Sequence, residues 1–157
     1  MLIAALALPL ACRPSARLPA EDALRDSIAR RVAQGPGTIV SLDSILSGEW
    51  RTLYLFGAYT PYYAVEQCVD GFVNSRGLGV QDGWLLFVLE PVSGRRSSRL
   101  VRGGLPFGHD ATDRIYPRGA ASFVVEIDSS GGYRRTRLRP TSSAVRRCPR
   151  AIHPDFG

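Results

Sequence analysis

The chain contains no lysine: all 20 of its basic residues are arginine, against 14 acidic residues, which gives a formal net charge of +6. Complete use of one cation is typical of biased codon usage in a GC-rich genome rather than of selection for contacts with phosphate groups. The arginines are also scattered, and a solvated strand face accounts for their clusters better than a polyanion site does. We therefore expect no nucleic-acid partner.

Histidine is almost as scarce, because only His109 and His153 are present, and the three cysteines form no Cys-x-x-Cys pair. One cluster could carry catalysis: His109 with Asp110 and Asp113, where an imidazole beside carboxylates could act as a general base or hold a metal ion. No further ligand pair such as His-x-x-x-His accompanies it. We favour a polar loop whose aspartates accept backbone hydrogen bonds, with no catalytic residue, no metal and no cofactor. An envelope hydrolase that uses this loop is the alternative.

Long apolar runs are lacking as well. The N-terminal run extends only from Leu2 to Ala11, directly before Cys12, whereas a membrane-spanning helix needs about 20 apolar residues. A short apolar run that closes on a small residue is typical of an export signal, and a cysteine directly after it is what a lipoprotein signal requires. We therefore expect residues 1–12 to be an export signal and the protein to reside in the periplasm or the membrane-anchored cell envelope.

The leader departs from the usual lipoprotein pattern in two respects. No basic residue precedes the apolar run, and Pro9 stands where leucine is usual, three positions before the cysteine. An ordinary signal, a true start further upstream, and a buried N-terminal helix or strand therefore stay open. We expect a lipid on Cys12 to anchor the protein to the membrane, residues 13–19 to be a tether and residues 20–157 to be a single domain.

Cysteine parity agrees with export. Once Cys12 is assigned to the leader, Cys68 and Cys148 remain as an even pair, and such a pair in an oxidising compartment predicts a disulfide. A thiol nucleophile or a metal ligand is the less favoured alternative, because so few histidines are available as partners.

Hydropathy patterns predict an α+β domain with a mostly antiparallel sheet of about five strands. Leucine, isoleucine and valine at intervals of four predict an amphipathic helix over 19–34, and residues 50–56 predict a central strand that is apolar on both faces. We expect one face of that strand to carry Trp50, Thr52, Tyr54 and Phe56, and the other to carry Leu53 and Leu55.

The other elements are shorter. Thr60 as N-cap and Pro61 as first residue predict a short internal helix that ends at Cys68. Strands are expected at 38–40, at 84–90 and 99–102 as one hairpin, and at 122–127 and 133–139 as a second hairpin. An irregular loop is expected over 103–119.

The segment from Glu49 to Thr60 resembles one found in a group of small, uncharacterised bacterial secreted proteins and lipoproteins. Those proteins carry W-D-x-x-Y-x-F-G-P-Y-T, then a helix and an apolar hairpin. The matching residues here are Trp50, Tyr54, Phe56, Gly57, Tyr59 and Thr60. Arg51 replaces the usual aspartate and Ala58 the usual proline. The resemblance covers residues 36–102 and implies an envelope location and this fold, but no activity.

Aromatic residues supply the best candidate for a binding site. Tyr59, Tyr62 and Tyr63 crowd a turn rich in glycine and proline, where some of the rings must stay exposed. They could line a groove for a peptide or glycan, although aromatics near a strand end more often belong to the core. With the arginine face at Arg135 and Arg137, they predict a non-enzymatic envelope protein that binds an unknown envelope protein or polymer.

Overall fold

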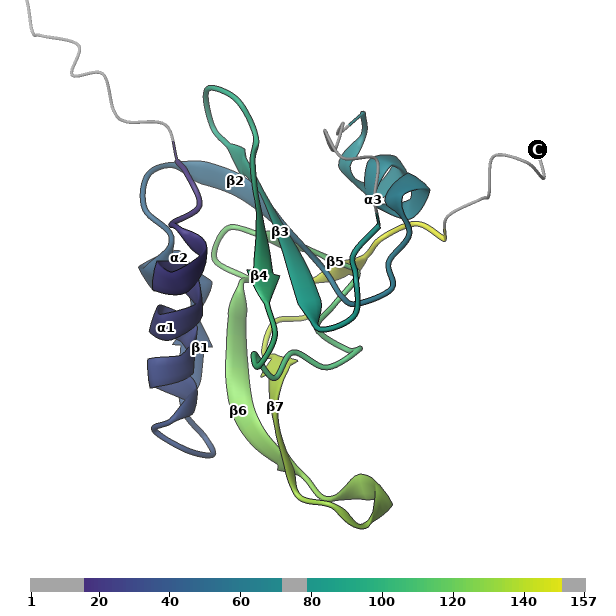
Figure 1. Ribbon diagram of the computed structural model, residues 1–157. Coiled ribbons are helices and arrows are strands. Elements are labelled where there is room, and N and C mark those ends of the chain that lie inside the picture. The colour runs from purple at the N-terminus through teal and green to yellow at the C-terminus, as the bar shows by residue number, and fades with distance from the viewer. Residues whose placement is uncertain (1–15, 72–78, 151–157) are drawn as a thin grey trace, which may run out of the picture.

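The computed structural model describes residues 16–71 and 79–150 (Figure 1). The expected signal and Cys12 therefore lie outside the described residues. The helices are α1 (Glu21–Val32), α2 (Leu42–Ile45) and α3 (Tyr62–Val69), with one 3-10 turn, η1 (Ser130–Gly132). The strands are β1 (Ile39–Ser41), β2 (Trp50–Phe56), β3 (Trp84–Pro91), β4 (Ser97–Arg102), β5 (Arg114–Pro117), β6 (Ser122–Asp128), β7 (Arg135–Pro140) and β8 (Arg146–Arg147).

The strands form two antiparallel sheets. The larger sheet has five strands in the order β4-β3-β2-β5-β8, and the smaller has three in the order β1-β6-β7. Both predicted hairpins are present, as β3 with β4 and β6 with β7. The predicted α+β class, its five-stranded antiparallel sheet and its N-terminal helix are confirmed. No helix among the described residues is long and apolar enough to cross a membrane.

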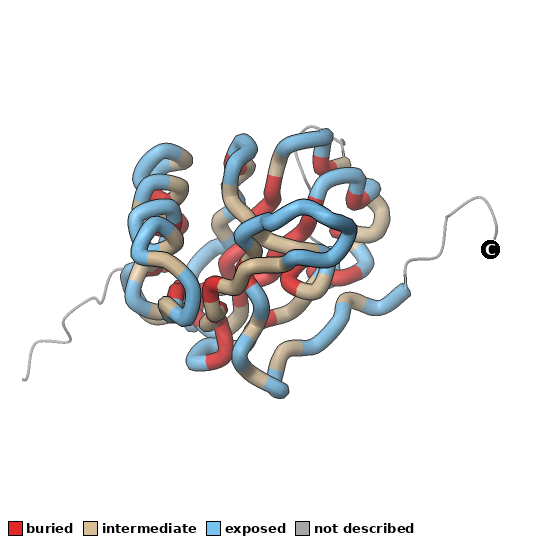
Figure 2. The backbone as a smooth tube through the Cα atoms, turned by 90° about the horizontal axis from the view of Figure 1, so that it is seen from below, coloured by how far each residue is buried: buried red, intermediate tan, exposed pale blue. Residues whose placement is uncertain are grey.

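Strand β2 is the middle strand of the larger sheet, and both of its faces are covered. On one face Leu53 and Leu55 are fully buried in the main core, which also holds side chains of α1, β3 and β6. On the other face Tyr54 and Phe56 are buried with side chains of β3 and α3. Consecutive buried residues are what a strand covered on both faces requires. Figure 2 shows the buried segments in the interior, behind exposed loops.

Helix α1 closes the main core at one side, beside β4 and β1 (Figure 1). Leu24 and Ile28 are its fully buried residues and join the main core. Acidic residues occupy its first turn and Arg30 and Arg31 its last turn, an arrangement that the helix dipole favours. The burial of one stripe only is the pattern that the sequence predicted for this helix.

The expected orientation of Trp50 is wrong. The pairing of β2 with β3 shifts between Trp50 and Thr52, so Arg51 forms a bulge there. A bulge adds one residue to one strand and reverses the alternation of the side chains that precede it. Trp50 consequently packs, 1% exposed, in the main core with Leu53. It does not share the face of Tyr54.

The expected irregular loop over 103–119 contains a strand. Strand β5 pairs with β2, with Tyr116 opposite Leu53. Tyr116 is fully buried and donates its hydroxyl proton to the Ala111 carbonyl, and burial raises its pKa well above the ordinary tyrosine range. The four residues of β5 end in proline and alternate too little to be recognised as a strand from the sequence. They form one because β2 offers unpaired backbone groups on the side that β3 does not occupy.

Part of the expected tether is packed into the domain. Ala16 and Leu18 are 1% and 5% exposed and belong to the main core, and Arg17 forms an antiparallel bridge with Ser47. The Leu18 amide donates to Ser97 Oγ at 3.2 Å. Residues 16–19 therefore belong to the domain, and the expected boundary at residue 20 is corrected to an earlier position.

The predicted disulfide is present and joins Cys68 at the end of α3 to Cys148 after β8. The two Cα atoms lie 5.2 Å apart, and the bond closes a loop of 80 residues. It ties the edge strand β8 and the chain beyond it to the helix that covers the second core. The bond therefore holds together two elements that lie far apart in the sequence.

Removal of this bond should destabilise the whole domain. In the chain-entropy model a loop of this length contributes roughly 4 to 5 kcal/mol to the free energy of unfolding, and native-state strain lowers that figure. We expect the double variant Cys68→Ala/Cys148→Ala to lose up to this amount in urea denaturation. Wild-type protein measured with a reductant serves as control and should match the variant. Equal midpoints for oxidised wild type and variant would contradict the expectation.

Candidate functional site

The turn between β2 and α3 is organised by a distant carboxylate. The amide of Gly57 donates to Asp113 Oδ1 at 3.4 Å, and the Thr60 hydroxyl lies 2.7 Å from the same oxygen. That hydroxyl also lies 2.9 Å from the Gly57 carbonyl oxygen, so its single proton is shared between two acceptors. Thr60 is therefore not the N-cap that the sequence predicted. The N-cap of α3 is Pro61, without a side-chain cap.

A second segment holds the turn from its other side. The amide of Tyr59 donates to the Val80 carbonyl, and the amide of Val80 donates to the Thr60 carbonyl, both at 2.8 Å. Gly79 makes this approach possible, because a Cβ at that position would lie 2.6 Å from the Thr60 oxygen. Two segments that are distant in the chain thus fix the conformation of residues 57–60.

This turn concentrates backbone strain. Among the described residues, the non-glycine residues with positive φ are Tyr59 at 67°, Asp70 at 51° and Asp113 at 55°. Two of the three meet at the turn. A left-handed conformation costs a bulky residue roughly 1 to 3 kcal/mol, and such residues gather at binding and catalytic sites. The surrounding hydrogen bonds are what hold both residues in place.

A pocket of about 240 Å³ opens beside the turn. Tyr59 at its rim is 73% exposed, although most large apolar side chains of the described residues are buried. Among the described residues of the wall, Asp113 is the one that carries a charge. The lining residues are Phe56, Ala58, Tyr59, Thr60, Pro61, Ala64, Asp113, Cys148 and Pro149. The disulfide thus brings the C-terminal segment into the wall of the pocket.

The hydroxyl group of Tyr59 has an acidic neighbour. A hydrogen bond to the Asp82 carboxylate raises the pKa of Tyr59 above the usual 10.0. The hydroxyl therefore remains a neutral donor at physiological pH. The Tyr59 amide is thus held by Val80, and its hydroxyl lies beside the Asp82 carboxylate.

The other two candidate tyrosines do not line the pocket. Tyr62 is half-buried, and its hydroxyl donates to Glu66 Oε1 at 2.7 Å within α3, which raises the pKa of Tyr62. Tyr63 is also half-buried on α3. Of the three tyrosines that the sequence singled out, the structure places Tyr59 alone at the pocket.

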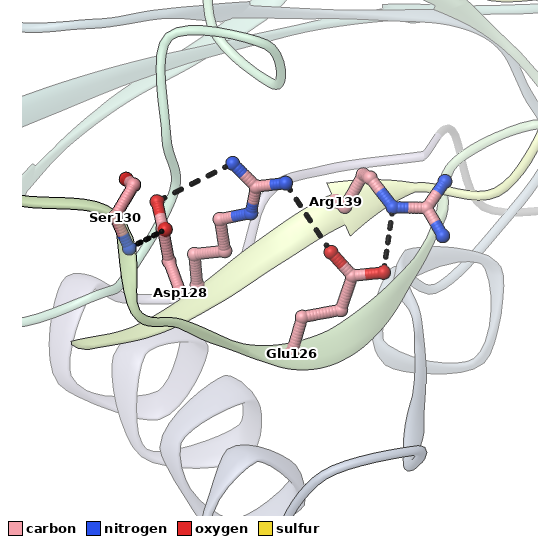
Figure 3. Close-up of polar contacts among 5 residues, drawn as sticks. Glu126, Asp128, Ser130 and Arg139 are labelled. Atoms are coloured by element: carbon pink, nitrogen blue, oxygen red, sulfur yellow. Dashed lines mark hydrogen bonds and ion pairs between the residues drawn. The ribbon is translucent and has the colours of Figure 1, made fainter. Parts of the chain in front are cut away.

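The candidate arginines lie on a different part of the molecule. Arg135 and Arg137 are on β7, at the end of the smaller sheet away from α3 (Figure 1). The guanidinium of Arg137 bridges Asp128 Oδ2 at 3.5 Å and Glu126 Oε2 at 3.4 Å. Arg139 Nε donates to Glu126 Oε1 at 2.7 Å and completes a ladder of alternating charge (Figure 3).

Arg135 stands beside this ladder, with its guanidinium carbon 5.9 Å from the centre of the Tyr133 ring. The structure therefore brings Arg135 and Arg137 together with acidic and aromatic partners of their own sheet. It does not bring them to the pocket at Tyr59.

The histidine cluster is divided by the structure. His109 is exposed in the loop before β5, and the Asp110 carbonyl accepts a hydrogen bond from Arg114 Nε at 3.2 Å. Asp113 is directed to the β2-α3 turn instead, where Thr60 and Gly57 bind it. Within the described ranges, no three His, Cys, Asp or Glu side chains are placed to hold a metal ion.

Comparison with known proteins adds no assignment: no family model matches the chain, and no curated protein or solved structure matches it. The candidate site therefore rests on its own geometry. Sequence reasoning missed Asp82 and Pro149, which the fold brings to Tyr59 and to the pocket. It also assigned Asp113 to a different cluster. The predicted disulfide could have indicated that the segment around Cys148 lies near the turn, because its partner Cys68 is in the helix that follows the turn.

Strain at Tyr59 predicts an unusual order of stabilities. Glycine adopts positive φ without cost. The free energy of unfolding of Tyr59→Gly should therefore be about 1 kcal/mol larger than that of Tyr59→Ala, so the glycine variant should be the more stable one. Tyr133 provides the matched control, because it is 71% exposed and has an ordinary φ of −120°. There the glycine variant should be the less stable one. The same order at both positions in chemical denaturation would contradict the interpretation.

The ladder on β6 and β7 predicts sensitivity to acid. The bond from Arg139 lowers the pKa of Glu126 below its usual 4.5, and bonds from Ser130 lower the pKa of Asp128 below 3.8. Because both pKa values are lowered on folding, the stabilisation is complete above those usual values and is lost as pH falls through the lowered ones. Denaturation between pH 6 and pH 2 should show a shallower decline for Glu126→Gln than for wild type. Parallel pH profiles would show that the ladder does not contribute.

Proposed function

We propose that this protein is a non-enzymatic binding module of the cell envelope, exported and anchored through a lipid on Cys12, and that the pocket at Tyr59 is its recognition site. The observation that carries the binding role is the strained and exposed Tyr59 beside that pocket. Strain persists only where the surroundings maintain it. Four hydrogen bonds maintain it here, two accepted by the Asp113 carboxylate and two that join Val80 to Tyr59 and Thr60. An exposed, rigid aromatic ring is a typical anchor in binding interfaces.

The proposed anchor has a consequence for geometry. Ala16 is already part of the core, and a chain of four residues reaches at most about 14 Å. A lipid on Cys12 would therefore hold the domain at the membrane surface and not at a distance from it. The disulfide and the resemblance of residues 49–60 to secreted proteins support an oxidising location outside the cytoplasm.

Export and acylation are tested by mass. Intact-mass analysis of the protein from membrane fractions should give a chain that begins at Cys12 and carries acyl groups. Cys12→Ser should abolish the added mass and release the protein from the membrane fraction. An uncleaved chain that starts at Met1 and stays in the cytosol would refute the envelope location.

The recognition site is tested by cross-linking in cells. Ala58 is exposed and lines the pocket, so a photoreactive residue at this position should trap a defined partner. Photoreactive residues at Tyr133, on the distant hairpin, should trap none. Tyr59→Ala should reduce the adduct at position 58 several-fold, whereas His109→Ala should leave it intact. Equal adducts at positions 58 and 133, or loss of the adduct in His109→Ala alone, would refute this site.

A further inference from the structure

We propose that the pocket at Tyr59 binds a single cationic side chain, lysine or arginine, presented by a partner protein. This inference rests on the proposed binding role of the pocket and names its ligand. It is carried by the size of the pocket, by the sign of the charge in its wall, and by the exposed ring at its rim.

The size of the pocket fits one side chain. Its volume of about 240 Å³ is below the roughly 300 to 1,000 Å³ of sites that enclose small molecules. Its rim is open, because Tyr59 is 73% exposed and Ala58 and Pro61 are exposed as well. A free small molecule would remain largely in solvent there. A side chain of a protein obtains the rest of its binding energy from the surrounding interface.

The charge in the wall is negative. Asp113 Oδ1 accepts the bonds from Gly57 and Thr60, and no hydrogen bond from the described residues reaches its other oxygen, Oδ2. A carboxylate oxygen with unused lone pairs is a strong acceptor for an ammonium or guanidinium group. The Asp82 carboxylate at the Tyr59 hydroxyl adds a second negative charge nearby.

No arginine is among the described residues that line this wall, although the chain has 20 arginines. By contrast, Arg30 lines both clefts beside α1. The sign of the charge at the Tyr59 pocket is thus opposite to the net charge of +6. The one charged group that an incoming cation meets among the described lining residues is the Asp113 carboxylate, which would repel an anion.

The aromatic and apolar groups suit a cation on a methylene stem. The face of a tyrosine ring attracts an ammonium or guanidinium group within about 6 Å, and the backbone of Tyr59 is held in position by its bond to Val80. Phe56, Ala64 and Pro149 provide apolar contacts in the wall. Lysine and arginine bury such stems while their charged ends remain near polar groups.

The test is a titration of the full chain with blocked amino acids, followed through the amide NMR signals of residues 58–60. The Nα-acetyl N-methylamide of lysine should bind at least 5-fold more tightly than that of norleucine, which has the stem without the charge. Asp113→Asn should abolish this preference. Asparagine retains the acceptor for Thr60 and tolerates positive φ, so the turn should persist. Tyr59→Phe should retain the preference, and Tyr59→Ala should weaken lysine binding several-fold.

Asp43→Asn is the matched control, because Asp43 Oδ1 also accepts a backbone hydrogen bond, from Gly119 at 3.1 Å, but far from the pocket lining. It should leave the preference unchanged. Equal binding of lysine and norleucine would overturn the inference and leave an apolar recognition site. A partner trapped at position 58 without any shift by the lysine or arginine compound would also overturn it. Absence of both the adduct and the shifts would refute the proposed binding role itself.

Discussion

The burial of strand β2 on both faces is the constraint on which the rest of the structure depends. Leu53 and Leu55 require cover on one side and Tyr54 and Phe56 on the other, so one short strand needs two separate cores. The smaller sheet and α1 form the first core, and α3 forms the second. Each buried aliphatic or aromatic side chain contributes roughly 1.5 to 3 kcal/mol through removal from water. Loss of either cover would therefore expose a large part of the apolar surface that stabilises the domain.

The recognition site follows from this constraint. Because Phe56 is the last residue of β2 and is buried under α3, the chain must turn sharply at Gly57 to start that helix. Gly57 packs so closely against Thr112 that a Cβ would lie 2.8 Å from its hydroxyl, and Asp113 is thereby brought to the turn. The strain at Tyr59 and Asp113 is thus held by the core, the hydrogen bonds and the disulfide together. A turn held in this manner presents Tyr59 without the entropy cost of ordering a mobile loop.

Local patterns in the sequence predicted those features that short segments determine by themselves. The periodicity of Leu24 and Ile28 predicted α1, continuous apolar residues predicted β2 and β3, and cysteine parity predicted the disulfide. Long-range pairing determined the others. The bulge at Arg51 that turns Trp50 into the main core, the four-residue strand β5, and the bond from Thr60 to Asp113 across 53 residues all depend on partners that are distant in the chain. The exposure of Tyr59 was predictable from its turn, but its carboxylate neighbours were not.

The distribution of charge explains how a strongly basic chain can contain a pocket that favours cations. Arg137 and Arg139 are paired with Glu126 and Asp128 on the smaller sheet, and such exposed pairs contribute little to stability. They do reduce the free positive charge of that surface. Interactions between exposed charges are screened beyond about 8 Å at physiological ionic strength, so the charges nearest the pocket have the largest effect there. Among the described residues, the groups at the pocket that favour a cation are the Asp113 carboxylate, the nearby Asp82 carboxylate and the ring of Tyr59.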